Sequence, residues 1–154
     1  MKVVENIKER IRQATMRDIA TLTELRMSEL QSKDNIDLVH ETMTYLQFNL
    51  NSTVLAWIVE LNNEPIGTVF VEVNRGLPTK TNISGIYGQI QGVYIKPEHR
   101  NRTLGTVLIT DVVTDLRDSE FAYLQVEVND DLLPLFKQIG FTQHGRLLRL
   151  TYHR

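Results

Sequence analysis

The chain has 154 residues, with 17 Lys plus Arg against 19 Asp plus Glu and no cysteine. This length predicts one domain over residues 1–154, and the balanced charge argues against nucleic acid as a partner, since no cationic field attracts a phosphate backbone. The lack of cysteine excludes disulfides and thiolate metal sites, and we expect no bound metal. No signal peptide or membrane-spanning run is recognisable, so the sequence predicts a cytoplasmic protein without a membrane partner.

Hydrophobic periodicity divides the chain into alternating strands and helices, with one long loop at 75–85. Thr15, followed three residues later by Asp18, has the pattern of a helix-start cap. In chain order we expect a strand at 11–15, helices at 19–30 and 38–50, strands at 53–61, 66–73 and 87–95, a helix at 104–116, a strand at 121–128, a helix at 129–139 and a strand at 141–152. This alternation favours an α/β fold with a mixed sheet and helices on both faces.

The stretch most informative about function joins a strand to a helix at residues 93–106. Pro97 has no backbone N–H and therefore ends the pairing of the strand. The first turn of the next helix carries N–H groups without partners inside the helix, and the helix dipole adds partial positive charge there. Arg100 and Arg102 add further positive charge, and Gly105 lacks a Cβ where an anion would approach. These features predict a pyrophosphate site; a solvated loop that carries two arginines and a glycine is the open alternative.

The segment 100–105, RNRTLG, resembles the acyl-CoA loop of the GNAT superfamily, in which Arg or Gln is followed by two residues, Gly, one residue, and Gly or Ala. The first and last positions match, whereas Thr103 replaces the middle glycine. The resemblance covers nearly the whole chain: the opening strand and helix, Gly67 after the expected hairpin turn, and Gly140-Phe141 near the end are all similar to the family.

This resemblance implies a mostly antiparallel seven-stranded sheet, splayed between the strands that end at Ile95 and Val128 to admit the pantetheine arm of acetyl-CoA. The strand backbone at the splay would pair with pantetheine, and one of its N–H groups would polarise the acetyl carbonyl. The cofactor-binding residues that the resemblance implies are Val93, Tyr94, Ile95, Arg100, Asn101, Arg102, Thr103, Leu104, Gly105, Thr106, Asn129 and Phe136. Capping of the following helix is an equally good role for Asn129.

The sequence assigns neither a general acid nor a general base. Phe136 occupies the position at which many family members have a tyrosine acid, and it has no proton to donate. Losing a general acid costs on the order of a hundred- to ten-thousand-fold in rate, which activity can survive. Tyr94 is a weak candidate for the acid, and Tyr87 and Tyr123 are others; an ordinary core or surface role is the alternative for each. Members of the family sometimes use a carboxylate of a strand near the cleft as a base, acting through water. The polar strand residues near the expected cleft are Glu72, Gln89, Gln91 and Glu127, and an ordinary exposed strand position is the alternative for each.

The acceptor is expected to be a primary amine of a small molecule or peptide. Acidic residues near the first two helices would either attract such a cation or simply face water, and they are Glu29, Asp34, Asp37 and Glu41. The loop at 75–85 is long enough to cover an acceptor site, and a contact in a homodimer is an open alternative. The sequence thus predicts an acetyl-CoA-dependent N-acetyltransferase. The competing hypotheses are an acyl-CoA-binding module with little catalysis and an unrelated α/β domain.

Overall fold

The structure is a computed structural model that describes residues 9–152, and only the backbone of residues 101 and 102. Its elements are β1 (Glu9–Gln13), the 3-10 helix η1 (Met16–Asp18), α1 (Ile19–Leu30), α2 (Ile36–Asn49), β2 (Val54–Leu61), β3 (Glu64–Arg75), β4 (Ile86–Ile95), the 3-10 helix η2 (Pro97–Arg102), α3 (Leu104–Asp115), β5 (Leu124–Val126) and α4 (Leu133–Ile139). The elements expected up to residue 139 are present with shifted ends, and the 3-10 helix η2 lies between the strand expected at 87–95 and the helix expected at 104–116.

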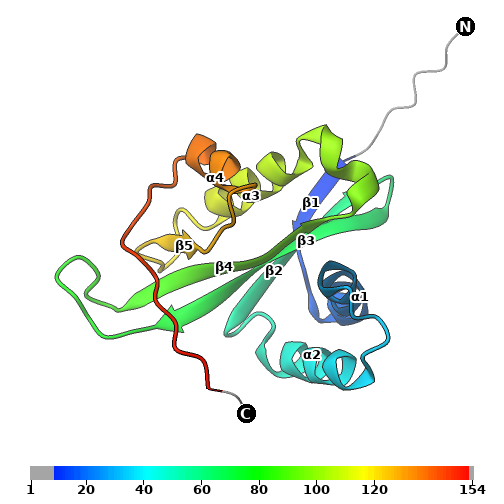
Figure 1. The fold of residues 1–154 in the computed structure, drawn as a ribbon, viewed down its shortest axis with the longest axis horizontal. Coiled ribbons are helices and arrows are strands. Elements are labelled where there is room, and N and C mark those ends of the chain that lie inside the picture. Colours follow the sequence, from blue (N-terminus) through cyan, green and yellow to red (C-terminus); the bar gives the residue numbers. More distant parts are fainter. Residues whose placement is uncertain (1–8, 153–154) are drawn as a thin grey trace, which may run out of the picture.

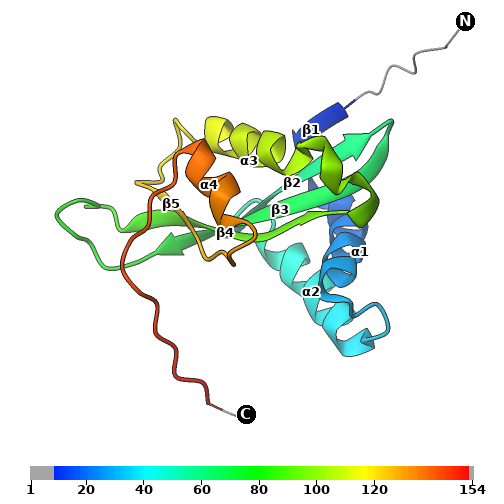
Figure 2. The ribbon, with the colours of Figure 1, turned by 45° about the horizontal axis from the view of Figure 1, so that its top comes forward.

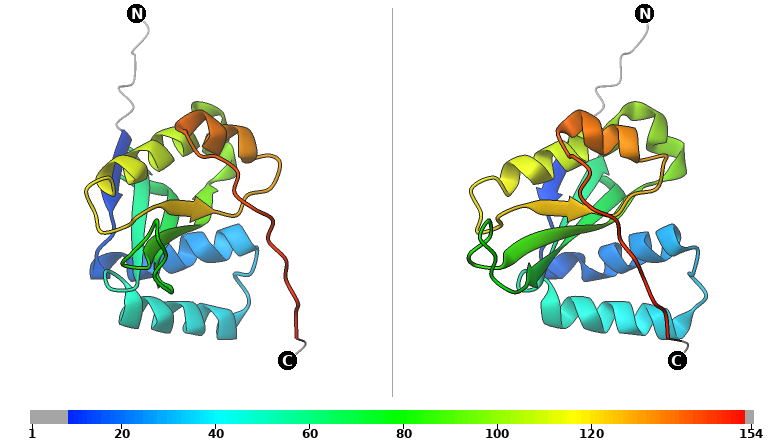
Figure 3. Two further views of the ribbon diagram at one scale, coloured as in Figure 1. Left: turned by 90° about the vertical axis from the view of Figure 1, so that its left-hand side faces the viewer. Right: turned by 60° about the vertical axis from the view of Figure 1, so that its left-hand side comes forward.

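One sheet forms the centre of the molecule, with its strands in the order β1-β2-β3-β4-β5. The first four strands pair antiparallel in chain order, and β5 pairs parallel with β4 after the chain has crossed over through α3. Helices α1 and α2 cover one face of the sheet, and α3 and α4 cover the other (Figures 1 and 3). The predicted fold class, a mixed sheet with helices on both faces, is therefore confirmed. Within residues 9–152, no helix combines the length and apolarity needed to cross a membrane.

Each face of the sheet carries its own hydrophobic core. Trp57 and Val59 of β2 point to the side of α3, whereas Ala56 and Ile58 point to the side of α1 and α2. Successive side chains of a strand face opposite ways, so a strand covered on both sides must be apolar without interruption. The near-continuous apolar run of β2 therefore follows from its central place in the sheet. The Trp57 indole also donates a hydrogen bond to Asp115 Oδ2 at 2.8 Å, which joins the end of α3 to the sheet.

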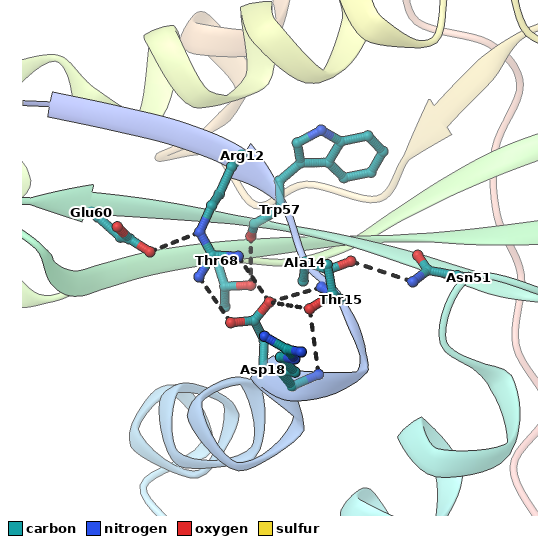
Figure 4. Close-up of polar contacts among 9 residues, drawn as sticks. Arg12, Ala14, Thr15, Asp18, Asn51, Trp57, Glu60 and Thr68 are labelled. Atoms are coloured by element: carbon teal, nitrogen blue, oxygen red, sulfur yellow. Dashed lines mark hydrogen bonds and ion pairs between the residues drawn. The ribbon is translucent and has the colours of Figure 1, made fainter.

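A network of ion pairs connects β1 to the start of α1 (Figure 4). The Arg12 guanidinium donates to both carboxylate oxygens of Asp18 and to Glu60 Oε1, each at 2.8 Å. The Thr15 N–H donates to Asp18 Oδ2 at 2.8 Å, and Thr15 Oγ1 accepts from the Arg17 N–H at 3.4 Å. The predicted helix-start cap is thus confirmed. The adjacent Arg12 guanidinium lowers the pKa of Asp18 to about 2.

The prediction of a strand at 141–152 is wrong, because this segment belongs to no strand. The sheet of the described residues has five strands rather than seven. Strand β5 has only three residues, so its outer edge offers few N–H and C=O groups to a further strand. The pattern that predicted the strand consists instead of side chains that are 69% to 91% exposed, namely Leu147, Leu148, Leu150 and Tyr152.

Candidate active site

The pairing of β3 with β4 is irregular at Gly92, inside β4. Thr68 of β3 faces Tyr94, yet Phe70, two residues further along β3, faces Gln91, three residues back along β4. Strand β4 therefore contains one extra residue, which is a β-bulge. Gly92 has a φ of +60°, in the left-handed region that glycine enters without steric cost. An isolated glycine inside a strand is the usual signal of a bulge, but the strand at 87–95 was predicted without one.

Strands β4 and β5 separate just before this bulge. They pair only over Gly88, Gln89 and Ile90 of β4, and β4 then continues without a partner on that side among the described residues. Beyond the last paired residues, a cavity of about 170 Å³ lies between β4 and the segment that follows β5. Its lining includes Glu29, Gly92, Val93, Val128, Asn129 and Phe136. The strands thus part at the place where the splay was expected. Pockets for whole ligands usually measure about 300 Å³ or more, so this cavity suits only the end of a long ligand.

A second irregularity lies between η2 and α3, where Thr103 is held at a φ of +56° and a ψ of +15°. Its side chain does not cap α3, and the first hydrogen bond into the helix runs from the Val107 N–H to the Thr103 carbonyl at 3.2 Å. The N–H groups of Leu104, Gly105 and Thr106 therefore have no acceptor inside α3. Partial positive charge gathers at this end of the helix, as an anion site requires. The sequence predicted that a helix starts at Leu104, but it did not predict the left-handed conformation of Thr103.

Gly105 is not required by the packing of α3. A Cβ built on it would meet only Leu135 Cδ1, at 3.5 Å, which is an ordinary van der Waals contact. Glycine in a helix destabilises the fold by roughly 0.5–1 kcal/mol relative to alanine. Since packing does not require glycine at position 105, something other than stability favours it there. A ligand that approaches the backbone closely would be such a factor.

The predicted arginine of the loop folds back over the end of β4. Arg100 Nε donates to the Ile95 carbonyl at 2.9 Å, and its guanidinium carbon lies 5.7 Å from the centre of the Tyr94 ring. A permanent positive charge therefore lies beside the junction of β4 and η2. His99 Nδ1 is buried in the same turn without a hydrogen-bond partner among the described residues. The side chains of Asn101 and Arg102, also predicted to bind the cofactor, lie outside the described part of the chain.

Both roles weighed for Asn129 are compatible with its position. Its Oδ1 accepts a hydrogen bond from the Leu132 N–H at 3.2 Å, in the turn before α4, and the residue also lines the cavity. Phe136 is 1% exposed, packs edge-on against Phe141 with the ring centres 5.2 Å apart, and forms part of the cavity wall. The position at which many family members have a tyrosine acid therefore lies in the cavity wall, and its phenylalanine ring has no proton to donate.

None of the three tyrosines proposed as acids lines this cavity. Tyr94 is buried under Arg100, while Tyr87 and Tyr123 stack on each other with ring centres 5.1 Å apart. Of the polar strand residues considered as bases, Gln91 and Glu127 line the cavity, whereas Glu72 and Gln89 do not. Of the acidic helix residues, only Glu29 does. The loop at 75–85 contributes no residue to the lining, and Figure 2 shows it extending away from the helices.

Comparison with known proteins places this geometry in a family. The model of the acetyltransferase (GNAT) family matches residues 19–141. A predicted acetyltransferase from Clostridium acetobutylicum, solved with acetyl-CoA, is 27% identical, with 94% of this chain and 96% of that chain covered and a TM-score of 0.82.

Two more distant structures show likeness of fold alone. Aminoglycoside N-acetyltransferase AAC(6')-Iy in complex with CoA is 15% identical, with 99% of this chain and 100% of that chain covered and a TM-score of 0.75. Glucosamine-6-phosphate N-acetyltransferase from Arabidopsis thaliana is 11% identical, with 95% and 99% covered and a TM-score of 0.73. No curated protein matches the chain.

Proposed function

We propose, since the chain belongs to the acetyltransferase (GNAT) family, that it transfers the acetyl group of acetyl-CoA to a primary amine of a small molecule or peptide. The observation that carries the proposal is the cavity at the parting of β4 and β5, together with the N–H groups that open α3 and have no acceptor inside that helix. Helix α4 connects the two features: Leu135 lies against Gly105, and the next residue, Phe136, lines the cavity. One long ligand with an anionic middle would reach both.

The proposed path of the cofactor follows β4. The pyrophosphate binds the N–H groups at the start of α3, with Arg100 beside it and the side chains of Asn101 and Arg102 as further predicted contacts. Pantetheine lies along residues 93–95 of β4, whose outer edge has no strand partner among the described residues, and pairs with it as an added strand would. The acetyl group enters the cavity between Asn129 and Phe136.

Transfer can then proceed without a general acid, although more slowly than with one. The amine attacks the carbonyl carbon, the new C–N bond forms, and the C–S bond breaks with its electron pair on sulfur. An alkyl thiol has a pKa near that of cysteine, about 8.5, so the thiolate is a tolerable leaving group near neutral pH. An N–H of the unpaired β4 edge would stabilise the negative charge that develops on the carbonyl oxygen. This chemistry is compatible with phenylalanine at position 136.

Titration calorimetry with coenzyme A and assays of thiol release test this function. We expect Gly105→Val to keep the fold and to weaken CoA binding severely, because its larger side chain would stand beside the N–H groups that open α3. Gly105→Ala is the control, since the family pattern accepts alanine here and packing leaves room for the added methyl group.

The assays also separate the alternatives. Wild-type binding of CoA without amine-dependent thiol release, across a panel of amines, would favour an acyl-CoA-binding module. Equal CoA binding by Gly105→Val and the wild type would overturn the pyrophosphate assignment.

We further propose that the protein is cytoplasmic and forms a homodimer. The absence of cysteine fits a reducing compartment. Leu148 and Leu150 are exposed, and Arg149 between them lies 3.7 Å from Glu127, just past the end of β5, the last strand of the sheet of the described residues; this exposed apolar segment supports contact with a second copy. Light scattering after gel filtration is expected to show a dimer that Leu148→Asp weakens; a wild-type monomer at high concentration would refute it.

A further inference from the structure

The cavity is lined by a carboxylate that the cofactor path does not use. We propose that Glu29 of α1 binds the ammonium group of the acceptor, and that Arg26, one helical turn earlier, positions the Glu29 carboxylate. This inference rests on the proposed function, because the acceptor must reach the acetyl group at the same cavity. It identifies the substrate as a primary alkylammonium ion, recognised through its charge.

The ion pair of these two residues lies directly against the bulge of β4. Arg26 Nη1 donates to Glu29 Oε1 at 2.5 Å, and the two side chains are 31% and 20% exposed. A Cβ built on Gly92 would come within 2.9 Å of Arg26 Nη1 and 3.3 Å of Glu29 Oε1. A Cβ at this position would push the end of the Arg26 side chain aside, and the φ of +60° itself favours glycine. Glu29 and Gly92 line the same cavity, so the carboxylate lies beside the strand edge along which the thioester is proposed to lie.

Glu29 is better placed for this role than the other acidic residues. Among the described residues that line the cavity, only Glu29 and Glu127 can ionise. The Glu127 side chain is 65% exposed, and Arg149 Nη2 lies 3.7 Å from its Oε2, outside the sheet edge. Asp34, Asp37 and Glu41, which shared the sequence-based prediction, do not line the cavity.

The chemistry of a carboxylate suits an incoming amine. Primary alkylamines have a pKa near that of lysine, about 10.4, and so arrive protonated at neutral pH. A carboxylate has about four lone-pair sites, so Glu29 can accept from an ammonium group while it keeps its bond from Arg26. The ordered ion pair restricts the side chain to one orientation, which reduces the entropy lost on binding.

The same contact allows Glu29 to accept a proton from the ammonium group during acetyl transfer. The ammonium group passes one proton to Glu29, and the freed nitrogen lone pair forms the bond to the carbonyl carbon. The C–S bond breaks with its electron pair on sulfur, and the second nitrogen proton moves through water to the thiolate. Glu29, partly exposed, then returns its proton to solvent. The products are the amide, the free thiol of coenzyme A and one proton.

An NMR titration tests the binding role without requiring catalysis. Butylamine is added to the protein saturated with coenzyme A, and the Gly92 amide signal is followed, with 1-butanol as the neutral control. We expect saturable shifts in the wild type and in Glu24→Gln, an exposed carboxylate of the same helix, and none in Glu29→Gln or with butanol. Shifts in Glu29→Gln equal to those of the wild type would overturn the proposal. Butylamine binding that depends on Glu29, without any amide product, would refute the proposed function alone.

Steady-state kinetics then separate binding from positioning. Glu29→Gln is expected to raise the KM for butylamine about 10- to 100-fold, the range for a lost hydrogen bond to a charged group, with the KM for acetyl-CoA unchanged. Arg26→Ala is expected to raise the same KM less, and Arg26→Lys to restore it in part. An unchanged amine KM in Glu29→Gln would overturn the binding role. An Arg26→Ala variant that behaves like the wild type would overturn the positioning role.

Discussion

Thr103 offers the sharpest test of how the cofactor loop is built. Its φ of +56° and ψ of +15° lie in the left-handed region, which costs an L residue roughly 1–2 kcal/mol, and a β-branched side chain fits least well there. Thr103→Gly removes that strain but gives the unfolded chain more freedom, which opposes it by roughly 0.5–1 kcal/mol. We therefore expect Thr103→Gly to raise the free energy of unfolding by up to about 1 kcal/mol.

Thr103→Ala is the matched control, because it loses the same hydroxyl and methyl groups yet keeps the Cβ. Denaturation in urea should place Thr103→Ala about 1 kcal/mol below Thr103→Gly, which is a difference of roughly 2–4 °C in Tm for a chain of this size. Calorimetry should find CoA affinity in Thr103→Gly at least equal to that of the wild type, since the backbone N–H groups stay in place. If Thr103→Ala is as stable as Thr103→Gly, the left-handed conformation carries no strain and the reasoning fails.

Three other perturbations probe the bulge, the helix-start network and the aromatic wall of the cavity. Gly92→Ala should lower the free energy of unfolding by about 1–2 kcal/mol, because φ is +60° and the new Cβ would lie 2.9 Å from Arg26 Nη1; a urea midpoint equal to that of the wild type would contradict this. Arg12 lowers the pKa of Asp18 from 3.8 to about 2, so the stability that this pair adds is complete above about pH 4 and is lost as the pH falls through 2. Asp18→Asn should therefore be less stable at pH 7 and lose less stability between pH 4 and 2, as followed by circular dichroism; a pH dependence equal to that of the wild type would contradict the assignment. Phe136→Tyr should leave CoA affinity unchanged and raise thiol release, by about a hundredfold or more if its hydroxyl reaches the sulfur; lower affinity with no gain in rate would tell against this placement.

Local signals in the sequence were sufficient for most of the fold. The cap formed by Thr15 and Asp18, the hairpin around residues 62–65 and the helix after Thr103 each depend on neighbouring residues, and all are present in the structure. The junction between β4 and α3 was predicted for the same reason, since a proline, a short turn and the start of a helix are visible without any tertiary contact. Its role as a pyrophosphate site stays a prediction. Family resemblance then supplied the splay, which no local pattern encodes.

Features that depend on partners were harder to predict. The alternation at 141–152 is a valid strand pattern, but a strand also needs an edge to pair with, and β5 ends after three residues. The role proposed for Glu29 was equally hard to predict, because four acidic residues in and near α1 and α2 look alike in sequence. Only the packing of α1 against Gly92 distinguishes it from Asp34 and the others.

The bulge at Gly92 could have been predicted from the sequence, because the spacing of the apolar residues indicates it as well as the glycine does. Ile90, Val93 and Ile95 all pack toward the core under α3, and the step of three between the first two breaks the period of two that a regular strand requires. An unbulged strand with these residues would turn Val93 and Ile95 away from that core. The extra residue therefore keeps both halves of β4 anchored to one core and also makes room for the Arg26–Glu29 pair. Because the same residue serves the core and the cleft, a substitution that regularises β4 should damage stability and the site together.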